Sequence, residues 1–143
     1  MKTYYKVTAA LKVTAALVAG IVAGASHAIA ADLTGAEIKN TISGNTVYLE
    51  AMAGSVTGTP GKGVIYYAAD GTALYKTPKG ELWHGTWAIK ENTNCTNWKE
   101  AGRVACSRYD KQGDTITLIN PENGQARAKL LKTAPGNAEN LKP

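Results

Sequence analysis

Apolar and polar residues alternate with a period of two in most of the chain after residue 45. Successive side chains of a strand point to opposite faces, so such segments predict strands buried on one side. Turn-forming residues separate the segments, and none of the gaps has the pattern of a crossover helix. The alternation predicts seven strands, at residues 46–50, 64–68, 72–76, 82–89, 103–109, 115–119 and 125–131.

We therefore expect a mainly β fold, an antiparallel meander that closes into a small barrel or half-barrel, lipocalin-like in outline. Closure removes the exposed edges that an open sheet would present. Asp70-Gly71 lies between two β-forming segments and is a strong hairpin signal. The Gly-rich segment 53–63 predicts a mobile loop, and its spacing does not match a phosphate-binding loop.

One short helix is expected before the first strand. Thr34 and Glu37 have the spacing of a capping box, and Ile38 and Ile42 lie one turn apart on a common face. Ser43-Gly44-Asn45 follows as a stop signal, so the helix should span residues 35–41.

The first 30 residues have the pattern of a signal peptide. Lysines precede an apolar segment, and Ala28-Ile29-Ala30 is the kind of site that signal peptidase cleaves. We predict cleavage after Ala30, a β-rich domain at residues 31–132, a terminal coil at 133–143 and a periplasmic or secreted location. No stable membrane span is expected after cleavage.

The net charge falls when the leader is set aside. Three lysines of the leader account for most of the formal charge of +5, which leaves 13 basic against 11 acidic residues. No polybasic segment remains after the leader, so electrostatics do not favour nucleic-acid binding.

Segment 81–110 holds all three tryptophans, both cysteines and His84. An even cysteine pair in an exported chain predicts a disulfide, here Cys95–Cys106. We interpret the segment as a disulfide-tied pair of strands, 82–89 and 103–109, on either side of a polar turn at 91–94. The spacing fits neither a redox nor a haem motif, and zinc would need more ligands than His84 adds, so no metal or cofactor is expected.

The aromatic residues have two interpretations. Trp83, Trp87 and Trp98 either fill the core or form a stacking platform for a flat ligand. The candidate ligand-binding residues are Trp83, His84, Trp87, Trp98, Tyr66, Tyr67 and Tyr75. Ser107 and Asp110 could partner His84, but no local signature brings them together, so no catalytic residue is assigned.

Several motifs resemble a group of small exported proteobacterial proteins of unknown function. The shared features are the L-T-G-x-E-I start at residues 33–38, the Y-x-x-D-G-T hairpin at 67–72, the G-T-W strand at 85–87 and the Cys95, Trp98, Cys106 set. The resemblance implies an exported β-rich protein and brings no activity with it.

These patterns favour a non-enzymatic periplasmic protein that binds a small apolar or aromatic ligand, or an envelope protein, through its aromatic sheet. The alternatives are a small envelope hydrolase or enzyme inhibitor that uses the Gly-rich loop and the His84 region, and an accessory subunit of an envelope complex. The sequence leaves the ligand and the oligomeric state open.

Overall fold

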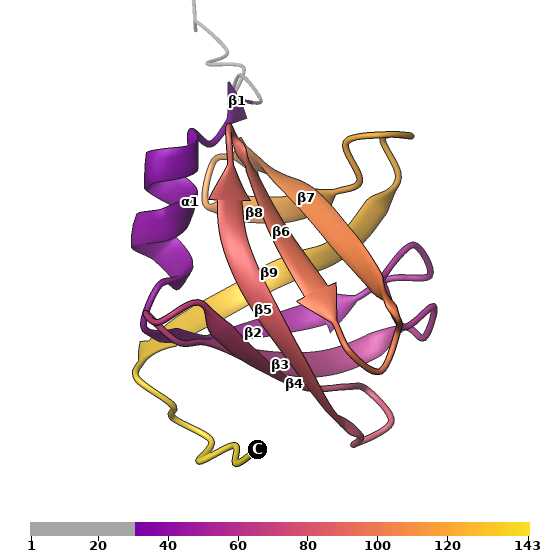
Figure 1. Cartoon of the computed structure of the whole chain (residues 1–143). Helices are drawn as coiled ribbons and strands as arrows, with labels where there is room; N and C mark the ends of the chain where they lie inside the picture. Colours follow the sequence, from indigo (N-terminus) through magenta and orange to yellow (C-terminus); the bar gives the residue numbers. More distant parts are fainter. Residues whose placement is uncertain (1–30) are drawn as a thin grey trace, which may run out of the picture.

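Eight antiparallel strands pair each with the next, and the last pairs with the first, so that the sheet closes into a barrel (Figure 1). A computed structural model describes residues 31–143. The barrel strands are β2 (Asn45–Ala51), β3 (Gly61–Tyr67), β4 (Thr72–Lys76), β5 (Leu82–Lys90), β6 (Thr93–Trp98), β7 (Arg103–Gln112), β8 (Thr115–Ile119) and β9 (Ala126–Pro135). A two-residue strand, β1 (Ala31–Asp32), pairs with β7. The predicted meander is confirmed, and it closes fully.

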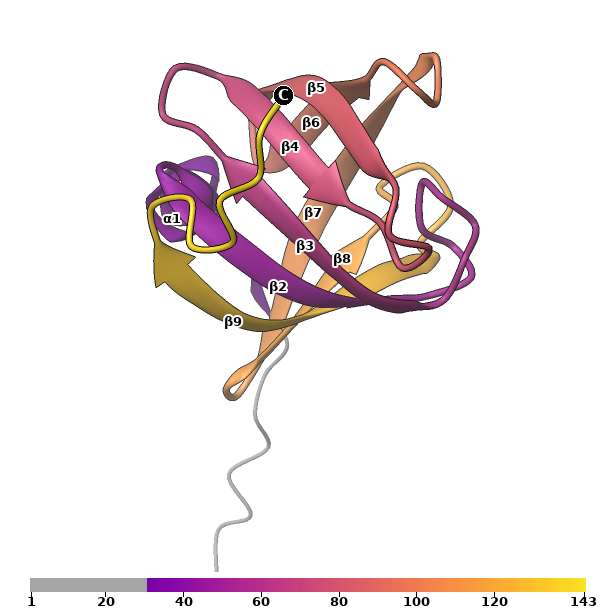
Figure 2. The same ribbon diagram turned by 90° about the horizontal axis from the view of Figure 1, so that it is seen from below.

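The helix α1 (Gly35–Ile42) lies against one end of the barrel, and the β2–β3 connection lies at the other (Figure 2). The capping box is confirmed: the Glu37 amide donates to the Thr34 hydroxyl at 3.3 Å, and the Thr34 amide donates to the Glu37 carboxylate at 2.8 Å. Ile38 and Ile42 are fully buried against β2, β5 and β6. Burying each of these side chains stabilises the docked helix by about 1.5–3 kcal/mol.

The inward faces of the strands form the core. Trp87 is buried, and Trp83 and Ile89 of the same strand pack against the core, as the alternation along residues 82–89 predicts. On β7 the alternation is also confirmed, because Ser107 and Tyr109 are buried inside the barrel.

The sequence pattern missed β6. Its inward side chains are Asn94, Thr96 and Trp98, and the first two are polar, so the segment has no apolar alternation. The predicted polar turn at 91–94 was therefore wrong in its extent, because Thr93 and Asn94 already belong to the strand. The disulfide joins β6 to β7, so the strand pair that it ties is not the predicted pair of 82–89 and 103–109.

Two predicted coil segments contain strand residues. Gly61–Gly63 of the Gly-rich segment open β3 and pair with Leu49–Ala51, so the loop is limited to residues 52–60. β9 continues to Pro135, past the predicted start of the terminal coil at residue 133. Thr46 holds the segment that follows, because its hydroxyl donates to the Gly136 carbonyl at 2.6 Å and accepts from the Ala138 amide at 2.9 Å.

The predicted signal peptide, residues 1–30, lies outside the described residues. Within residues 31–143, no helix combines the length and the apolar character needed to cross a bilayer.

Candidate functional site

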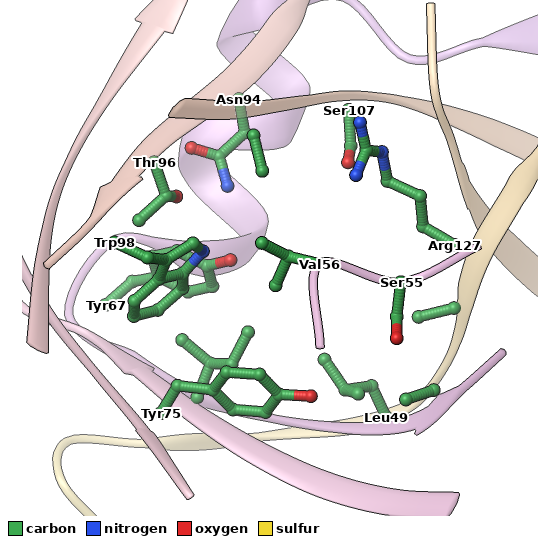
Figure 3. A pocket seen from close by; sticks show the side chains of 14 residues that line it. Leu49, Ser55, Val56, Tyr67, Tyr75, Asn94, Thr96, Trp98, Ser107 and Arg127 are labelled. Atoms are coloured by element: carbon green, nitrogen blue, oxygen red, sulfur yellow. The ribbon is translucent and has the colours of Figure 1, made fainter. Parts of the chain in front are cut away.

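A cavity of about 50 Å³ lies inside the barrel, below the β2–β3 connection (Figure 3). Its residues come from β2, β3, β4, β6, β7 and β9 and from the connection itself. They are Leu49, Ala51, Ser55, Val56, Ile65, Tyr67, Tyr75, Asn94, Thr96, Trp98, Ala105, Ser107, Arg127 and Ala128. The cavity is thus largely apolar and aromatic, with a few polar groups at separate points, as in small-molecule sites generally.

Three aromatic rings form one side of the cavity. Tyr75 and Trp98 are stacked at a tilt, with ring centroids 5.5 Å apart, and Tyr67 lies beside them (Figure 3). Two glycines make this packing possible, because a Cβ atom at Gly63 would lie 2.8 Å from the Tyr75 ring and one at Gly85 would lie 2.9 Å from the Trp98 ring.

Buried polar groups lie at the end of the cavity nearer α1. The Asn94 amide donates to the Tyr109 hydroxyl at 3.5 Å, and its carbonyl oxygen is buried with no partner among the described residues. Burial raises the pKa of Tyr109 to about 12. Burial also raises the pKa of Tyr75 to about 12, although its hydroxyl lies at the loop end of the cavity, near Gly63. Both phenols are therefore neutral at physiological pH and can donate hydrogen bonds.

Arg127 enters the cavity from the start of β9, and its guanidinium points toward Ser107 (Figure 3). Its Nε atom is buried and has no hydrogen-bond partner among the described residues. Burial lowers the pKa of the Arg127 guanidinium, the charge of Arg103 lowers it further, and Glu122 partly opposes both. The guanidinium nevertheless stays charged at physiological pH, because its ordinary pKa lies far above that range.

Two residues of the β2–β3 connection, Ser55 and Val56, line the cavity. Val56 packs against the core from this loop, and its backbone carbonyl accepts a hydrogen bond from Arg103 Nη2 at 2.8 Å. The Met52 amide, at the start of the loop, donates to the Arg127 carbonyl at 2.8 Å. Within the loop, the Ser55 and Thr57 hydroxyls lie 3.0 Å apart and share a hydrogen bond.

The structure divides the candidate ligand-binding residues into three groups. Tyr67, Tyr75 and Trp98 line the cavity. Trp83 and Trp87 pack behind this wall without lining the cavity: Trp83 meets Tyr75 edge-on at 6.1 Å, and Trp87 meets Tyr67 edge-on at 5.6 Å.

His84 and Tyr66 alternate with inward residues and so lie on the outer face. His84 Nδ1 lies 2.7 Å from a Glu100 carboxylate oxygen, and the His84 amide donates to the other oxygen at 2.7 Å. Slight burial acts to raise the pKa of Glu100, but the hydrogen bonds from His84 outweigh it and the pKa is lowered. The arrangement closes the turn after β6.

Of the residues that could have served a hydrolase, Ser107 is separated from His84 by the barrel wall. Ser107 lines the cavity, while His84 lies on the outer face. Within residues 31–143, no group of three His, Cys, Asp or Glu side chains is placed to hold a metal ion.

The sequence did not indicate Asn94, Thr96, Val56 or Arg127 as site residues. The polar pair Asn94 and Thr96 has period-two spacing with Trp98, and this was the one local signal that could have placed both on its face. Val56 and Arg127 carry no comparable signal, because their positions depend on the path of a loop and on strand register.

Comparison of the chain with protein-family models, with curated proteins and with solved structures found no match in any of the three.

Proposed function

We propose that the protein is a small ligand-binding barrel that takes a compact apolar or aromatic molecule into the interior cavity. The observation that carries this proposal is the cavity itself, with an aromatic wall of Tyr67, Tyr75 and Trp98 and with polar atoms at its two ends. A core built only for stability would fill this space and pair those atoms.

The loop at residues 52–60 controls ligand entry to this site. Drug-sized ligands occupy pockets of about 300–1,000 Å³, whereas this cavity measures about 50 Å³ with the loop in place. A ligand with one ring therefore enters by displacing Val56, whose side chain packs against the core and whose carbonyl accepts a hydrogen bond from Arg103. The surrounding strands need not separate.

The outer surface supports a small ligand over a protein partner. Among the described residues, the large apolar side chains that are exposed are Val104 and Leu131. They lie on β7 and β9, which are not neighbours in the barrel, and single exposed apolar residues are ordinary on a protein surface.

The proposed compartment is the periplasm. The Cys95–Cys106 disulfide supports an oxidising environment, since such bonds persist mainly outside the cytosol. The predicted leader at residues 1–30 is the other support, and intact-mass measurement of the protein from its native host tests it: a mature chain starting at Ala31 is expected, and retention of Met1 would contradict it.

Tryptophan fluorescence tests the interior site directly. We expect saturable changes in emission when small aromatic and aliphatic metabolites are titrated against the protein. Trp98→Phe should remove most of the change, because Trp98 lines the cavity, and the matched variant Trp83→Phe should retain it. An absent response, or a response that Trp98→Phe leaves intact, would refute the interior site.

A further inference from the structure

Arg127 reaches the cavity because of a β-bulge. Across the β8–β9 pair, Leu118 lies opposite Ala128 and Ile119 lies opposite Ala126, so Arg127 is the extra residue. Simple alternation would place Arg127 on the face opposite to its two alanine neighbours. A bulge re-aims a side chain in this way and is a recurrent feature beside functional sites.

The polar environment of the Arg127 guanidinium is incomplete. Nε is buried and unpaired, and the residues that line the cavity include no Asp or Glu. Glu122 is the acid close enough to influence Arg127, but it is exposed and forms no ion pair with it. An arginine kept partly buried without a hydrogen-bonded anion loses solvation that nothing in the fold restores.

A second arginine lies at the same end of the barrel. Arg103 begins β7, holds the loop at the Val56 carbonyl and is close enough to add to the positive field at Arg127. Two guanidinium groups at one opening raise the local concentration of anions. A guanidinium also matches a carboxylate geometrically, since its planar fork can donate two parallel hydrogen bonds.

We infer that the ligand of the interior site carries a carboxylate, which the Arg127 guanidinium binds while the apolar body lies against Trp98 and Tyr75. This inference rests on the proposed interior site. The small cavity and its apolar wall favour a compact carboxylic acid over an inorganic anion, because phosphate or sulfate has no apolar surface to bury there. Ser107 supplies a hydroxyl beside the same position (Figure 3).

Isosteric pairs of ligands test the inference. Benzoate is compared with benzamide, and acetate with acetamide, by calorimetric titration of the whole protein, with inorganic phosphate as a third probe. At least one carboxylate should bind about tenfold or more tightly than its amide, as expected for a charge-assisted hydrogen bond. Arg127→Gln should abolish this preference. Lys129→Gln removes the same charge from an exposed position on the same strand and should retain it.

The outcomes separate the inference from the proposed function. If acid and amide bind equally, or if the preference for the acid survives Arg127→Gln, then Arg127 does not bind a ligand carboxylate. The proposed interior site is not contradicted by either result. Tighter binding of phosphate than of either carboxylate overturns the inference in favour of an inorganic anion. If none of the five probes binds and no metabolite changes the Trp98 emission, the interior site itself fails. Should Arg127→Gln not fold, the wild-type comparison and Arg127→Lys, expected to retain part of the preference, decide the question.

Discussion

Cys95 of β6 lies directly opposite Cys106 of β7, with the Cα atoms 4.0 Å apart, and the two side chains form a disulfide. The neighbours Asn94 and Thr96 point inward, so the bond lies on the outer face of the barrel wall. It fixes the register of β6, a strand whose polar composition gives it little other preference for a sheet.

Removal of this disulfide should weaken the fold. The bond closes a loop with a sequence separation of 11, for which the chain-entropy model gives about 3 kcal/mol. We expect the double variant Cys95→Ala, Cys106→Ala to lose roughly this amount of unfolding free energy in urea titrations. Thiol titration of the denatured, unreduced protein should find no free thiol, and the detection of two would contradict the pairing.

The Tyr75 ring packs against β3 at Gly63. A Cβ atom there would lie 2.8 Å from the ring and 3.2 Å from a Leu49 methyl group, so Gly63→Ala forces the aromatic wall to move. Overpacking of this kind costs typically 1–3 kcal/mol, and urea denaturation should show it. Lys62→Ala, exposed on the same strand, should change stability by no more than about 0.5 kcal/mol. Equal effects would show that the ring does not lie against Gly63.

The buried tyrosines predict alkaline sensitivity. The phenols of Tyr75 and Tyr109 have pKa values raised by burial from 10 to about 12. Below pH 10 both are protonated in the folded and the unfolded chain, so their contribution is constant. As the pH rises from 10 toward 12, the unfolded chain loses these protons first and unfolding is favoured, by on the order of 1 kcal/mol for each tyrosine at pH 11.

Urea midpoints measured at pH 8, 10 and 11 check this dependence. Tyr109→Phe should reduce the loss of unfolding free energy between pH 8 and pH 11. The variant also removes the hydrogen-bond partner of Asn94, so it should be less stable at every pH. Tyr66→Phe, on the outer face, is the control and should lose as much stability between pH 8 and pH 11 as the wild-type protein does. A urea midpoint that does not change up to pH 11 would show that burial does not raise the pKa values of Tyr75 and Tyr109.

The proposed entry past Val56 predicts different effects of the same substitution at two positions of the loop. Val56→Trp places a large ring in the mouth of the cavity, so ligand binding should weaken at least tenfold while the barrel remains folded. Ala53→Trp adds the same ring to an exposed position of the same loop and should leave affinity unchanged. Calorimetric titration measures both, and equal affinities in the two variants would show that ligands do not pass Val56.

Local signals in the sequence were sufficient for much of the fold. The capping box at Thr34 and Glu37 and the hairpin at Asp70-Gly71 depend on neighbouring residues only, and both are confirmed. The alternation along residues 82–89 places Trp83, Trp87 and Ile89 on one face, and this face packs against the core because large apolar side chains gain most from burial.

The site could not be predicted in the same way, because it depends on contacts between distant segments. Asn94 is inside the barrel because β6 pairs with Ser107 on β7, and its own composition indicated a turn. β9 departs from simple alternation twice, at Arg127 opposite β8 and at Leu131 opposite β2. Each bulge changes by one residue which side chains of β9 point into the barrel, and no local sequence signal indicates either change.

The interior carboxylate site is the central claim, and intermolecular nuclear Overhauser effects between benzoate and the labelled protein test it most directly. We expect effects from the benzoate ring protons to the Trp98 indole, to the Tyr75 ring and to the Val56 methyl groups, all of which line the cavity. Effects confined to outer-face residues such as His84 and Tyr66, with none to Trp98, would contradict it.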